Sequence, residues 1–500
     1  MRSMRTINHW IDNRAEEATS GRSTPVFDPA TGETAAEVGL ASTADVDRAV
    51  ASAVAAFADW RDTPLAKRQR ILFAYRQILD ERSAEIAEAI TAEQGKTLPD
   101  AAGEVQRGLA VVEYACALPE LVKGSYSEQV STAVDMYSIR QPLGVVAGIT
   151  PFNFPAMVPM WMFPMAIACG NTFVLKPSEK DPSASMIAAE MFAEAGLPEG
   201  VLNVVQGDKV AVDRILEHPD VAAVSFVGST PIARYVHEQA SRSSKRLQAL
   251  GGAKNHMVVL PDADMDLAAD AAVSAAYGSA GERCMAISVV VTVGDAADRL
   301  IPRIEERARK LRVGPGAASD SDMGPLITGE HRDRVVGYID AGADAGARLV
   351  IDGRTTEVEG FADGFYVGPT LFDGVSSDMS IYSDEIFGPV LSIVRVGRFD
   401  EAIDLINDNP WGNGTAVFTN DGGAARTFQN RILVGMVGVN VPIPVPFSFY
   451  SFGGWKDSMF GDHDIYGPQS VDFYTRTKTV ISRWPDPIHR GVDLGFPVVE

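Results

Sequence analysis

Cysteine is scarce in this chain, with only Cys116, Cys169 and Cys284 among 500 residues. Three cysteines cannot make the disulfide framework of a secreted domain. The opening segment MRSMRTINHWIDN also lacks the apolar core of a signal peptide. Both absences predict a reducing, cytoplasmic compartment. Cys116 and Cys169 stand in apolar, alanine-rich surroundings, which indicates inert thiols of the core.

Positive charge is also in short supply, because 44 Lys and Arg residues stand against 66 Asp and Glu residues, a formal net charge of −22. Nucleic acids and anionic membranes both need a cationic surface, so we expect neither as a partner. A local cationic pocket for a small anionic substrate stays compatible with this balance. The length of the chain predicts two or three domains of an ordinary soluble protein.

No apolar run is continuous enough to cross a membrane as a helix. Residues 141–169 carry no charge, and a spanning helix needs about 20 such residues. Pro151, Pro155, Pro159 and Pro164 interrupt this run, and proline breaks the helical hydrogen-bond ladder. The segment therefore predicts a buried strand, a loop and a short helix.

Apolar periodicity divides the rest of the chain into helical and alternating parts. Up to about Gly124 the apolar residues mostly follow helical spacing. From about Gly144 to 252, short β-branched runs alternate with amphipathic helices, and a second α/β segment extends over about 253–440. Repeated strand–helix units predict a parallel, doubly wound sheet with a ligand at the carboxyl ends of its strands.

Two further segments, 131–143 and 472–484, alternate polar and apolar residues. This spacing predicts strands that are half exposed to solvent. Such strands could pair with the sheet of another subunit.

A dinucleotide site would have to do without the usual glycine signature, because no G-x-G-x-x-G follows a strand in 144–252. Lys176, Glu179 and Lys180 follow a predicted strand, and a lysine with an acid could bind both hydroxyls of a ribose. The acid would repel a 2′-phosphate, which favours NAD over NADP. Ser229 opens a helix whose amides could receive a pyrophosphate. The alternatives are a solvated turn for the first group and a plain N-cap for Ser229.

Cys284 is the strongest single candidate for chemistry. Small residues and glycines precede it, a β-branched run follows it, and Arg283 stands directly beside it. A free thiol has a pKa of ~8.5, and a neighbouring cation favours the reactive thiolate. The alternative is a buried, inert cysteine.

Several motifs together resemble the aldehyde dehydrogenase superfamily over about residues 8–484. They are TPFNFP, KPSE, FVGST, GERC, EIFGPV and FGGWK, in the order and spacing of that family. The segments GAKNH, RCMA and SFYSFGGWKDSMFGDHDIYGPQSVDFYTRTKTV resemble a narrower branch. That branch oxidises methylmalonate semialdehyde and transfers the acyl group to coenzyme A.

The resemblance implies an α/β fold with a parallel-sheet NAD-binding domain, an α/β catalytic domain and a small β oligomerisation arm. The expected boundaries are 1–125 and 145–252 for the NAD-binding domain, 253–440 for the catalytic domain, 126–144 and 472–500 for the arm, and 441–471 for a substrate funnel and linker. The usual assembly of the family is a homo-oligomer, either a dimer or a dimer of dimers.

The resemblance also implies roles for single residues. Cys284 would add to the aldehyde, and the resulting thiohemiacetal would be oxidised by NAD to a thioester. Asn153 and the backbone N–H of Cys284 would bind the developing oxyanion, where one donor is typically worth ~3 kcal/mol. Without the family, Asn153 would be a turn residue.

Four more positions match cofactor-contacting residues of the family. They are Thr150, Phe152, Gly251 and Glu385, the last of which would bind the nicotinamide ribose. Loop packing is the alternative for Thr150 and Phe152, and a surface position is the alternative for Glu385.

The water-activating glutamate of hydrolytic aldehyde dehydrogenases has no counterpart in QALGGAKNH. Ala249 or Leu250 takes its position, depending on the anchor, and neither can accept a proton. A thioester without such a base should hydrolyse slowly and await another thiol, which favours coenzyme A as co-substrate. His256 and Glu282 are alternative bases, although a packed His256 is the preferred interpretation. Glu282 replaces a common glutamine and could raise the pKa of the thiol or point away.

Arg107 and Arg283 match arginines that the narrower branch places at the substrate carboxylate, and a guanidinium fork suits a carboxylate. The alternatives are ion pairs with Glu104 and Glu282. An acid semialdehyde would give a thioester that loses CO2, so the products would be propionyl-CoA or acetyl-CoA. The choice between methylmalonate and malonate semialdehyde stays open.

Three other functions remain as alternatives. The first is a hydrolytic dehydrogenase of another acid semialdehyde, such as succinate semialdehyde. The second is a thiol hydrolase that pairs Cys284 with His256. The third is a non-catalytic binding protein, which the joint presence of Cys284, Asn153, Lys176 and Glu385 disfavours.

Overall fold

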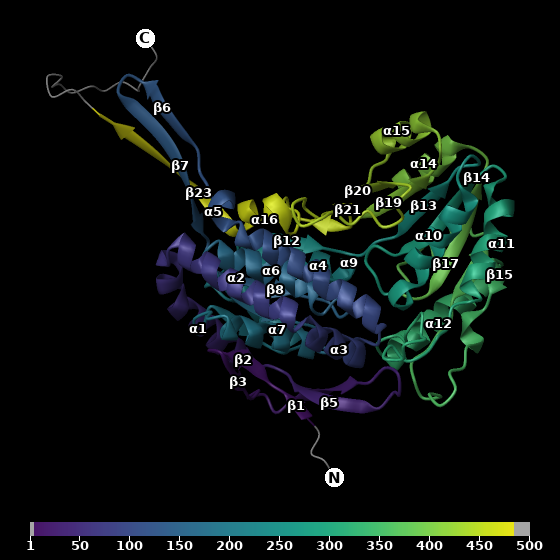
Figure 1. Ribbon diagram of the computed structural model, residues 1–500, viewed down its shortest axis with the longest axis horizontal. Helices are drawn as coiled ribbons and strands as arrows, with labels where there is room; N and C mark the ends of the chain where they lie inside the picture. Colours follow the sequence, from purple (N-terminus) through teal and green to yellow (C-terminus); the bar gives the residue numbers. More distant parts are fainter. Residues whose placement is uncertain (1–4, 485–500) are drawn as a thin grey trace.

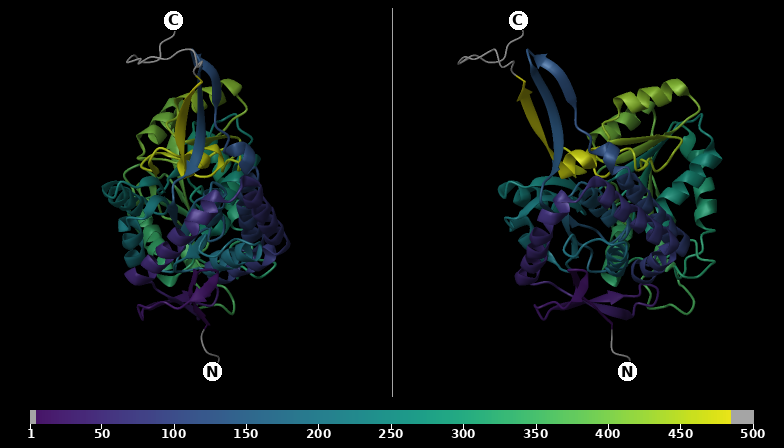
Figure 2. Two further views of the ribbon diagram at one scale, coloured as in Figure 1. Left: turned by 90° about the vertical axis from the view of Figure 1, so that its left-hand side faces the viewer. Right: turned by 60° about the vertical axis from the view of Figure 1, so that its left-hand side comes forward.

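The structure is a computed structural model that describes residues 5–484. Two bodies, each built around a β-sheet, lie side by side, and a narrow β-arm projects from the first (Figures 1 and 2). The chain crosses from the first sheet to the second through only four residues, 251–254.

The first body contains an eight-stranded sheet of order β22-β12-β11-β8-β9-β10-β2-β3. Five of these strands are parallel, and the order reverses at β8, where the chain moves first to β9 and later returns to β11 on the other side. The predicted doubly wound sheet is confirmed. The strands are β2 (His9–Ile11), β3 (Arg14–Glu16), β8 (Val145–Ile149), β9 (Thr172–Lys176), β10 (Leu202–Val204), β11 (Val221–Val227), β12 (Arg246–Leu250) and β22 (Met459–Phe460).

Helices cover both faces of this sheet, and each face has its own apolar cluster. The helices of one face are α1 (Thr43–Asp62), α8 (Lys209–Glu217) and α9 (Thr230–Arg242); the helices of the other are α2 (Leu65–Glu81), α3 (Ser83–Gln94), α4 (Leu98–Cys116), α5 (Leu118–Leu121), α6 (Met157–Ala168) and α7 (Ser183–Glu194). Because parallel strands are buried on both faces, β8 and β9 read as continuous apolar runs.

Residues 141–169 behave as their prolines indicate. They form the end of β7, the buried strand β8, a loop and the fully buried helix α6. Among residues 5–484, no helix is long and apolar enough to cross a membrane. Cys116 and Cys169 are buried, and burial raises the pKa of their thiols to about 11 and about 12.

The chain is mostly helical up to Gly124, as predicted, but its first part is not. Residues 5–39 form short strands, namely β2 and β3 of the large sheet and a separate three-stranded sheet of β1 (Arg5–Ile7), β5 (Thr34–Gly39) and β4 (Ser23–Phe27). Helical periodicity begins only at α1, where Ser42 and Asp45 form a capping box. Strands of three to six residues are too short to leave a clear period-2 signal.

The second body contains a seven-stranded sheet of order β15-β16-β17-β14-β13-β19-β20, parallel except for β15. Its strands are β13 (Asn255–Val259), β14 (Ile287–Val293), β15 (Arg348–Ile351), β16 (Thr370–Asp373), β17 (Val390–Val396), β19 (Gly414–Phe418) and β20 (Met436–Val439). Its helices are α10 (Met265–Tyr277), the 3-10 turn η1 (Gly278–Gly281), α11 (Ala296–Ala308), α12 (Gly329–Asp344), α13 (Ser380–Ser383), α14 (Phe399–Asp408) and α15 (Gly422–Arg431).

The arm is an antiparallel sheet of order β23-β7-β6, built from Thr475–Arg483, Val134–Pro142 and Tyr126–Ser131. The two alternating segments of the sequence therefore form strands, as predicted. The first residues of the predicted arm segment 472–500 belong instead to helix α16 (Gly467–Tyr474). Residues 485–500 lie outside the described residues.

Candidate active site

The site lies where the two sheets present opposite ends to each other. The carboxyl ends of β8, β9, β11 and β12 form one side, because the register aligns Ile149 with Lys176 and Val227 with Leu250. The amino ends of β13, β14, β17 and β19 form the other side. This meeting point lies beside β8, where the order of the first sheet reverses, which is where doubly wound sheets bind ligands.

Cys284 lies between η1 and β14, and two asparagines fix its backbone. The Nδ2 atoms of Asn255 and Asn413 donate to the carbonyl oxygen of Cys284, at 2.9 and 3.1 Å. Asn255 begins β13 and Asn413 directly precedes β19, so the thiol is anchored to two neighbouring strands. Neither asparagine stands out in the sequence, because each is separated from Cys284 by many residues.

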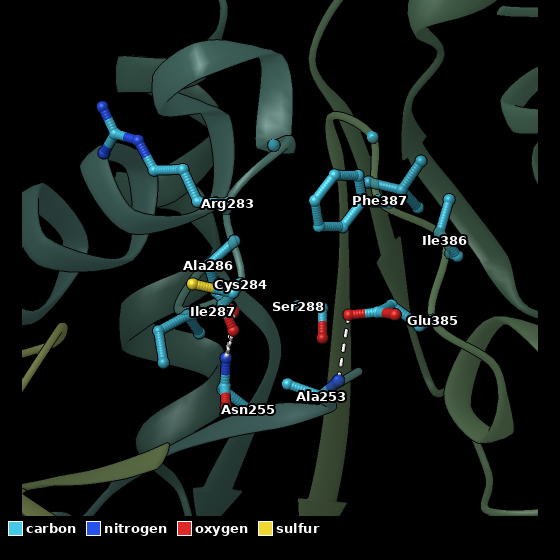
Figure 3. Close-up of a pocket in the computed structure, with 14 residues that line it drawn as sticks. Ala253, Asn255, Arg283, Cys284, Ala286, Ile287, Ser288, Glu385, Ile386 and Phe387 are labelled. Carbon is cyan, nitrogen blue, oxygen red and sulfur yellow. Dashed lines mark hydrogen bonds between the residues drawn. The ribbon is translucent and has the colours of Figure 1, made fainter. Parts of the chain in front are cut away.

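Cys284 lines two cavities. One also contains Glu385 and Phe387 (Figure 3). The other, of about 410 Å³, contains Arg107 and Arg283 and is here called the arginine cavity. Arg283 lines both cavities together with Cys284, so the two spaces adjoin at the loop of the thiol.

Arg283 favours the Cys284 thiolate, as expected, but its effect on the pKa is too small to offset burial. Burial raises the pKa of the Cys284 thiol to about 12, and the negative charge of Glu385 adds to the shift. Arg283 opposes the shift only weakly, because its guanidinium extends away from the sulfur (Figure 3) and pairs with Asp100. The thiol is therefore protonated at neutral pH in this structure.

A left-handed backbone shapes the loop before the thiol. Ser279, Ala280 and Gly281 have φ values of 53°, 50° and 75°. A Cβ on Gly281 would lie 2.2 Å from the carbonyl oxygen of Gly388, so only glycine fits there. The loop of Cys284 therefore packs directly against the backbone of the loop that carries Phe387.

Both predicted arginines line the arginine cavity, and neither makes the ion pair considered as its alternative. Arg283 pairs with Asp100 at 2.7 Å and not with Glu282. Arg107 does not pair with Glu104; its Nη2 donates to the carbonyl oxygens of Val445 and Pro446, at 3.2 and 3.0 Å.

Asn153 is held from both ends by buried polar groups. Its Nδ2 donates to the carbonyl oxygen of Glu282 at 3.0 Å, which directs the amide to the loop of Cys284. The Nζ of Lys96 donates to the carbonyl oxygen of Asn153 and to Glu104, both at 2.7 Å. Lys96 and Glu104 are both 0% exposed in their side chains. Nothing in the local sequence distinguishes Lys96 from a surface lysine, so the sequence analysis missed it.

Glu282 points away from the thiol. Of the two options left open by the sequence, that it raises the pKa of the thiol or that it points away, the structure shows the second. Its carboxyl accepts hydrogen bonds from Gln94 Nε2 at 2.7 Å and from the N–H of Ile327 at 3.3 Å, and it lies 3.5 Å from His331. Burial raises the pKa of this carboxyl to about 8. Glu282 therefore joins α3, α12 and the loop before α12 to the loop of Cys284.

Glu385 lines the same cavity as Cys284 and accepts a hydrogen bond from the N–H of Ala253 at 2.9 Å. Gly252 allows this approach, because a Cβ there would lie 2.4 Å from Glu385 Oε2. Burial raises the pKa of Glu385 to about 7. Lys254 anchors the segment before Glu385 by donating to the carbonyl oxygens of Ile381 and Asp384, at 2.8 and 2.6 Å.

The remaining cofactor candidates lie along the first sheet's edge. Lys176 is only 6% exposed and pairs with Glu179 at 2.8 Å, which excludes a fully solvated turn. The Lys180 ammonium lies 4.9 Å from the centre of the Phe152 ring. The N–H of Thr150 donates to the carbonyl oxygen of Lys176 at 3.1 Å.

Two features of this edge fit a bound dinucleotide. The buried Thr150 Oγ1 has no hydrogen-bond partner, which is unusual for a buried hydroxyl. Ser229 occupies the N-cap position of α9 without a side-chain capping bond, so its hydroxyl is available at the helix N-terminus. Gly251 lies beside Thr230 of the same helix, where a Cβ would be 2.9 Å from Thr230 Oγ1.

The positions that could have carried a water-activating base are apolar and buried. Ala249 and Leu250 are 0% and 3% exposed at the end of β12. His256 is packed, as preferred from the sequence: its Nε2 lies 3.1 Å from the Tyr382 hydroxyl, and burial lowers its pKa to about 3. His256 therefore bonds to Tyr382 and not to Cys284, which removes the geometric basis of a thiol hydrolase pair.

Comparisons with known proteins agree on one family. A sequence model of the aldehyde dehydrogenase family matches residues 16–480. A malonate-semialdehyde dehydrogenase of Pseudomonas aeruginosa is 55% identical over 496 residues, which are 99% of this chain and 100% of the relative. Malonate-semialdehyde dehydrogenase 1 of Geobacillus thermodenitrificans is 49% identical over 482 residues, covering 96% of this chain and 99% of the relative.

Two solved structures have nearly the same fold. A protein of Sinorhizobium meliloti 1021, assigned as a methylmalonate-semialdehyde dehydrogenase and complexed with NAD, matches with a TM-score of 0.96 and 53% identity, covering 98% of this chain and 100% of that one. The methylmalonate-semialdehyde dehydrogenase of Oceanimonas doudoroffii matches with a TM-score of 0.95 and 54% identity, covering 97% and 99%.

Proposed function

This chain belongs to the aldehyde dehydrogenase family, and we propose that it oxidises malonate semialdehyde and methylmalonate semialdehyde with NAD. In this proposal the acyl group passes to coenzyme A with loss of CO2. The similarity to the semialdehyde dehydrogenases of Pseudomonas aeruginosa and Oceanimonas doudoroffii supports the substrate class.

One observation carries the proposal: Cys284 lies between a cavity that contains Glu385 and a cavity that contains two guanidinium groups. A neutral aldehyde would gain nothing from Arg107 and Arg283, whereas a carboxylate on the substrate would bind either one in a bidentate manner. In this proposal the acid semialdehyde occupies the arginine cavity, and the cofactor approaches the thiol from the side of Glu385.

The chemistry begins at the sulfur, where the Cys284 thiol first releases its proton to solvent. The thiolate then adds to the aldehyde carbon, and the carbonyl oxygen takes up the negative charge. One N–H of the Asn153 amide is bonded to Glu282, so the second N–H and the backbone N–H of Cys284 are the donors for this oxyanion. Lys96 keeps the backbone of Asn153 in place.

NAD would be held along the edge of the first sheet. When bound, it supplies the hydride acceptor for the oxidation. Glu179, next to Lys176, would bind the adenosine ribose and disfavour a 2′-phosphate. The other residues proposed to hold the cofactor are Thr150, Phe152, Lys180, Ser229, Gly251 and Glu385.

The oxidation leaves a thioester on Cys284 whose α-carbon carries the carboxylate. The bond to that carboxylate breaks, CO2 leaves, and the electron pair enters the thioester enolate, which water then protonates at the α-carbon. Because Ala249 and Leu250 cannot activate water, the thioester lasts until the thiolate of coenzyme A attacks it. This attack releases propionyl-CoA or acetyl-CoA and returns the Cys284 thiolate.

The test is product analysis with each semialdehyde and NAD, with and without coenzyme A. We expect NADH and acyl-CoA in equal amounts with coenzyme A, and only about one NADH per active site without it, as for an enzyme that accumulates an acyl intermediate. The variant Cys284→Ala should abolish both, whereas the matched variant Cys116→Ala should retain both. Free acid released at the same rate without coenzyme A would contradict the proposal.

A further inference from the structure

Asp100 is an acidic residue in a cavity otherwise suited to an anion. We propose that Asp100 competes with the substrate carboxylate for Arg283, and thereby limits how tightly the arginine cavity holds that carboxylate before CO2 is lost. This inference rests on the proposed function, because it assigns Asp100 a part in the binding and decarboxylation of an acid semialdehyde.

The geometry fixes Arg283 between two neighbours. Asp100, in the first turn of α4, lies 2.7 Å from Arg283 Nη2 through its Oδ1, and the two side chains are 20% and 21% exposed. On the other side, a Cβ on Gly278 would lie 2.6 Å from Nη1. The guanidinium therefore has a defined position beside the cavity, and Asp100 occupies one of its edges.

Arg107 differs from Arg283 in this respect. It lies two turns after Asp100 on the same helix and also lines the cavity. Within residues 5–484 Arg107 forms no ion pair: its Nη2 donates to two backbone carbonyls, and its guanidinium carbon lies 5.3 Å from the centre of the Phe447 ring. A substrate carboxylate can thus bind Arg107 freely but must share Arg283 with Asp100.

The net charge of the arginine cavity suits one substrate carboxylate. Glu104 is also among the lining residues, but it is neutralised by Lys96. Two guanidinium groups and the Asp100 carboxylate leave a net charge of +1 (2 − 1). A monoanionic semialdehyde balances this charge.

The competition matters because the substrate carboxylate loses its charge as it becomes CO2. A strong pair with Arg283 would stabilise the carboxylate before this step more than during it, and such an interaction slows a reaction. Asp100 weakens the pair between Arg283 and the carboxylate of the bound substrate. As CO2 forms, Arg283 pairs with Asp100 again. Asp100 acts through Arg283, so it is a positioning residue.

Asp100→Asn tests this inference with methylmalonate semialdehyde and propanal, which has no carboxylate. In the variant Arg283 is free to hold the substrate carboxylate. We expect the KM for the semialdehyde, relative to that for propanal, to fall by about tenfold, and CO2 release in a single turnover to slow by about tenfold, since one charged hydrogen bond is redirected.

Two control variants separate this effect from a loss of structure. Asp100→Glu keeps the charge and should restore the wild-type KM ratio and rate of CO2 release. Glu113→Gln removes a carboxylate from the same helix, where it pairs with Arg76 at 2.8 Å outside the cavity, and should leave the ratio unchanged.

The outcomes distinguish the inference from the function on which it rests. An unchanged or higher KM ratio in Asp100→Asn, or equal losses with both aldehydes, overturns the inference alone if the wild-type protein releases CO2. If the wild-type protein oxidises the semialdehyde without releasing CO2, the proposed function and this inference both fail.

Discussion

Three ionisable side chains around the site have pKa values near neutral pH; Glu282 and Lys254 are buried, and Glu385 is half-buried. Burial raises the pKa of Glu385 to about 7 and of Glu282 to about 8, and it lowers the pKa of Lys254 to about 7. As the pH rises through this range, both carboxyls become charged and the ammonium loses its charge. The site therefore becomes more negative with rising pH, and the charge on Glu385 is the part of this change that disfavours the Cys284 thiolate.

We predict that Cys284 reacts slowly with alkylating reagents at neutral pH. A thiol whose pKa is about 12 is almost wholly protonated at pH 8, so in the cofactor-free protein we expect its alkylation by iodoacetamide to be at least ~100-fold slower than that of a free thiol. The rate should rise steadily to beyond pH 10. Mass spectrometry of the labelled peptide against pH measures it.

Arg283→Met is the informative comparison for this profile. Because Arg283 is the weakest of the influences on the thiol, the variant should alkylate with nearly the same pH dependence. A wild-type profile with its midpoint near pH 8, or a large upward shift in the variant, would show that the arginine activates the thiol after all.

Among the elements, α4 and α6 support the site most directly, through hydrogen bonds between them. Glu104 of α4 accepts hydrogen bonds from the N–H groups of Ala156 and Met157 at the start of α6, at 2.9 and 3.1 Å. Its partner Lys96 holds the backbone of Asn153 and lies 4.1 Å from the centre of the Phe154 ring. One buried ion pair thus positions the turn that carries Asn153, the proposed oxyanion donor.

Removing one partner of this pair should cost more than neutralising both. Lys96→Met leaves Glu104 buried without its cation, which should lower the free energy of unfolding by about 3–5 kcal/mol. Adding Glu104→Gln should recover at least ~1 kcal/mol, because an amide oxygen still accepts from α6 without a buried charge. Urea denaturation of the single and double variants measures both effects.

Lys310→Met provides the matched control, since Lys310 is 71% exposed and pairs with Glu306 one helical turn away at 2.7 Å. Its stability should stay close to that of the wild-type protein. A double variant that is less stable than Lys96→Met alone would refute the assigned role of the buried pair.

At the scale of the whole molecule, the arm is the feature whose outer strands have edges without a partner strand among the described residues. It extends beyond both sheets (Figures 1 and 2), and among the described residues β23 pairs only with β7. Ile481 and Tyr126 on its strands are 61% and 62% exposed. An exposed edge strand with apolar side chains favours pairing with another chain, which is consistent with the homo-oligomer that the family resemblance implies.

Ile481→Asp tests this role of the arm. We expect the wild-type protein to be an oligomer at micromolar concentration and the variant to shift toward the monomer, because a charge would be buried in the contact. Light scattering coupled to size-exclusion chromatography gives both masses. Phe73→Asp, at a 54% exposed position of α2, should keep the wild-type mass, and an unchanged mass for Ile481→Asp would remove the arm from the interface.

The sequence by itself determined the strand–helix units, the arm strands and the thiol at Cys284. These features depend on local periodicity and on motifs a few residues long. It failed for residues 5–39, whose strands are too short to show a period.

Only the tertiary structure decided which groups act on that thiol and on the two arginines. Asp100 and Arg283 are 183 residues apart, and Lys96 and the Asn153 carbonyl are 57 apart. Contacts over such separations leave no periodic trace in the chain, because they exist only once the two sheets and α4 have packed together.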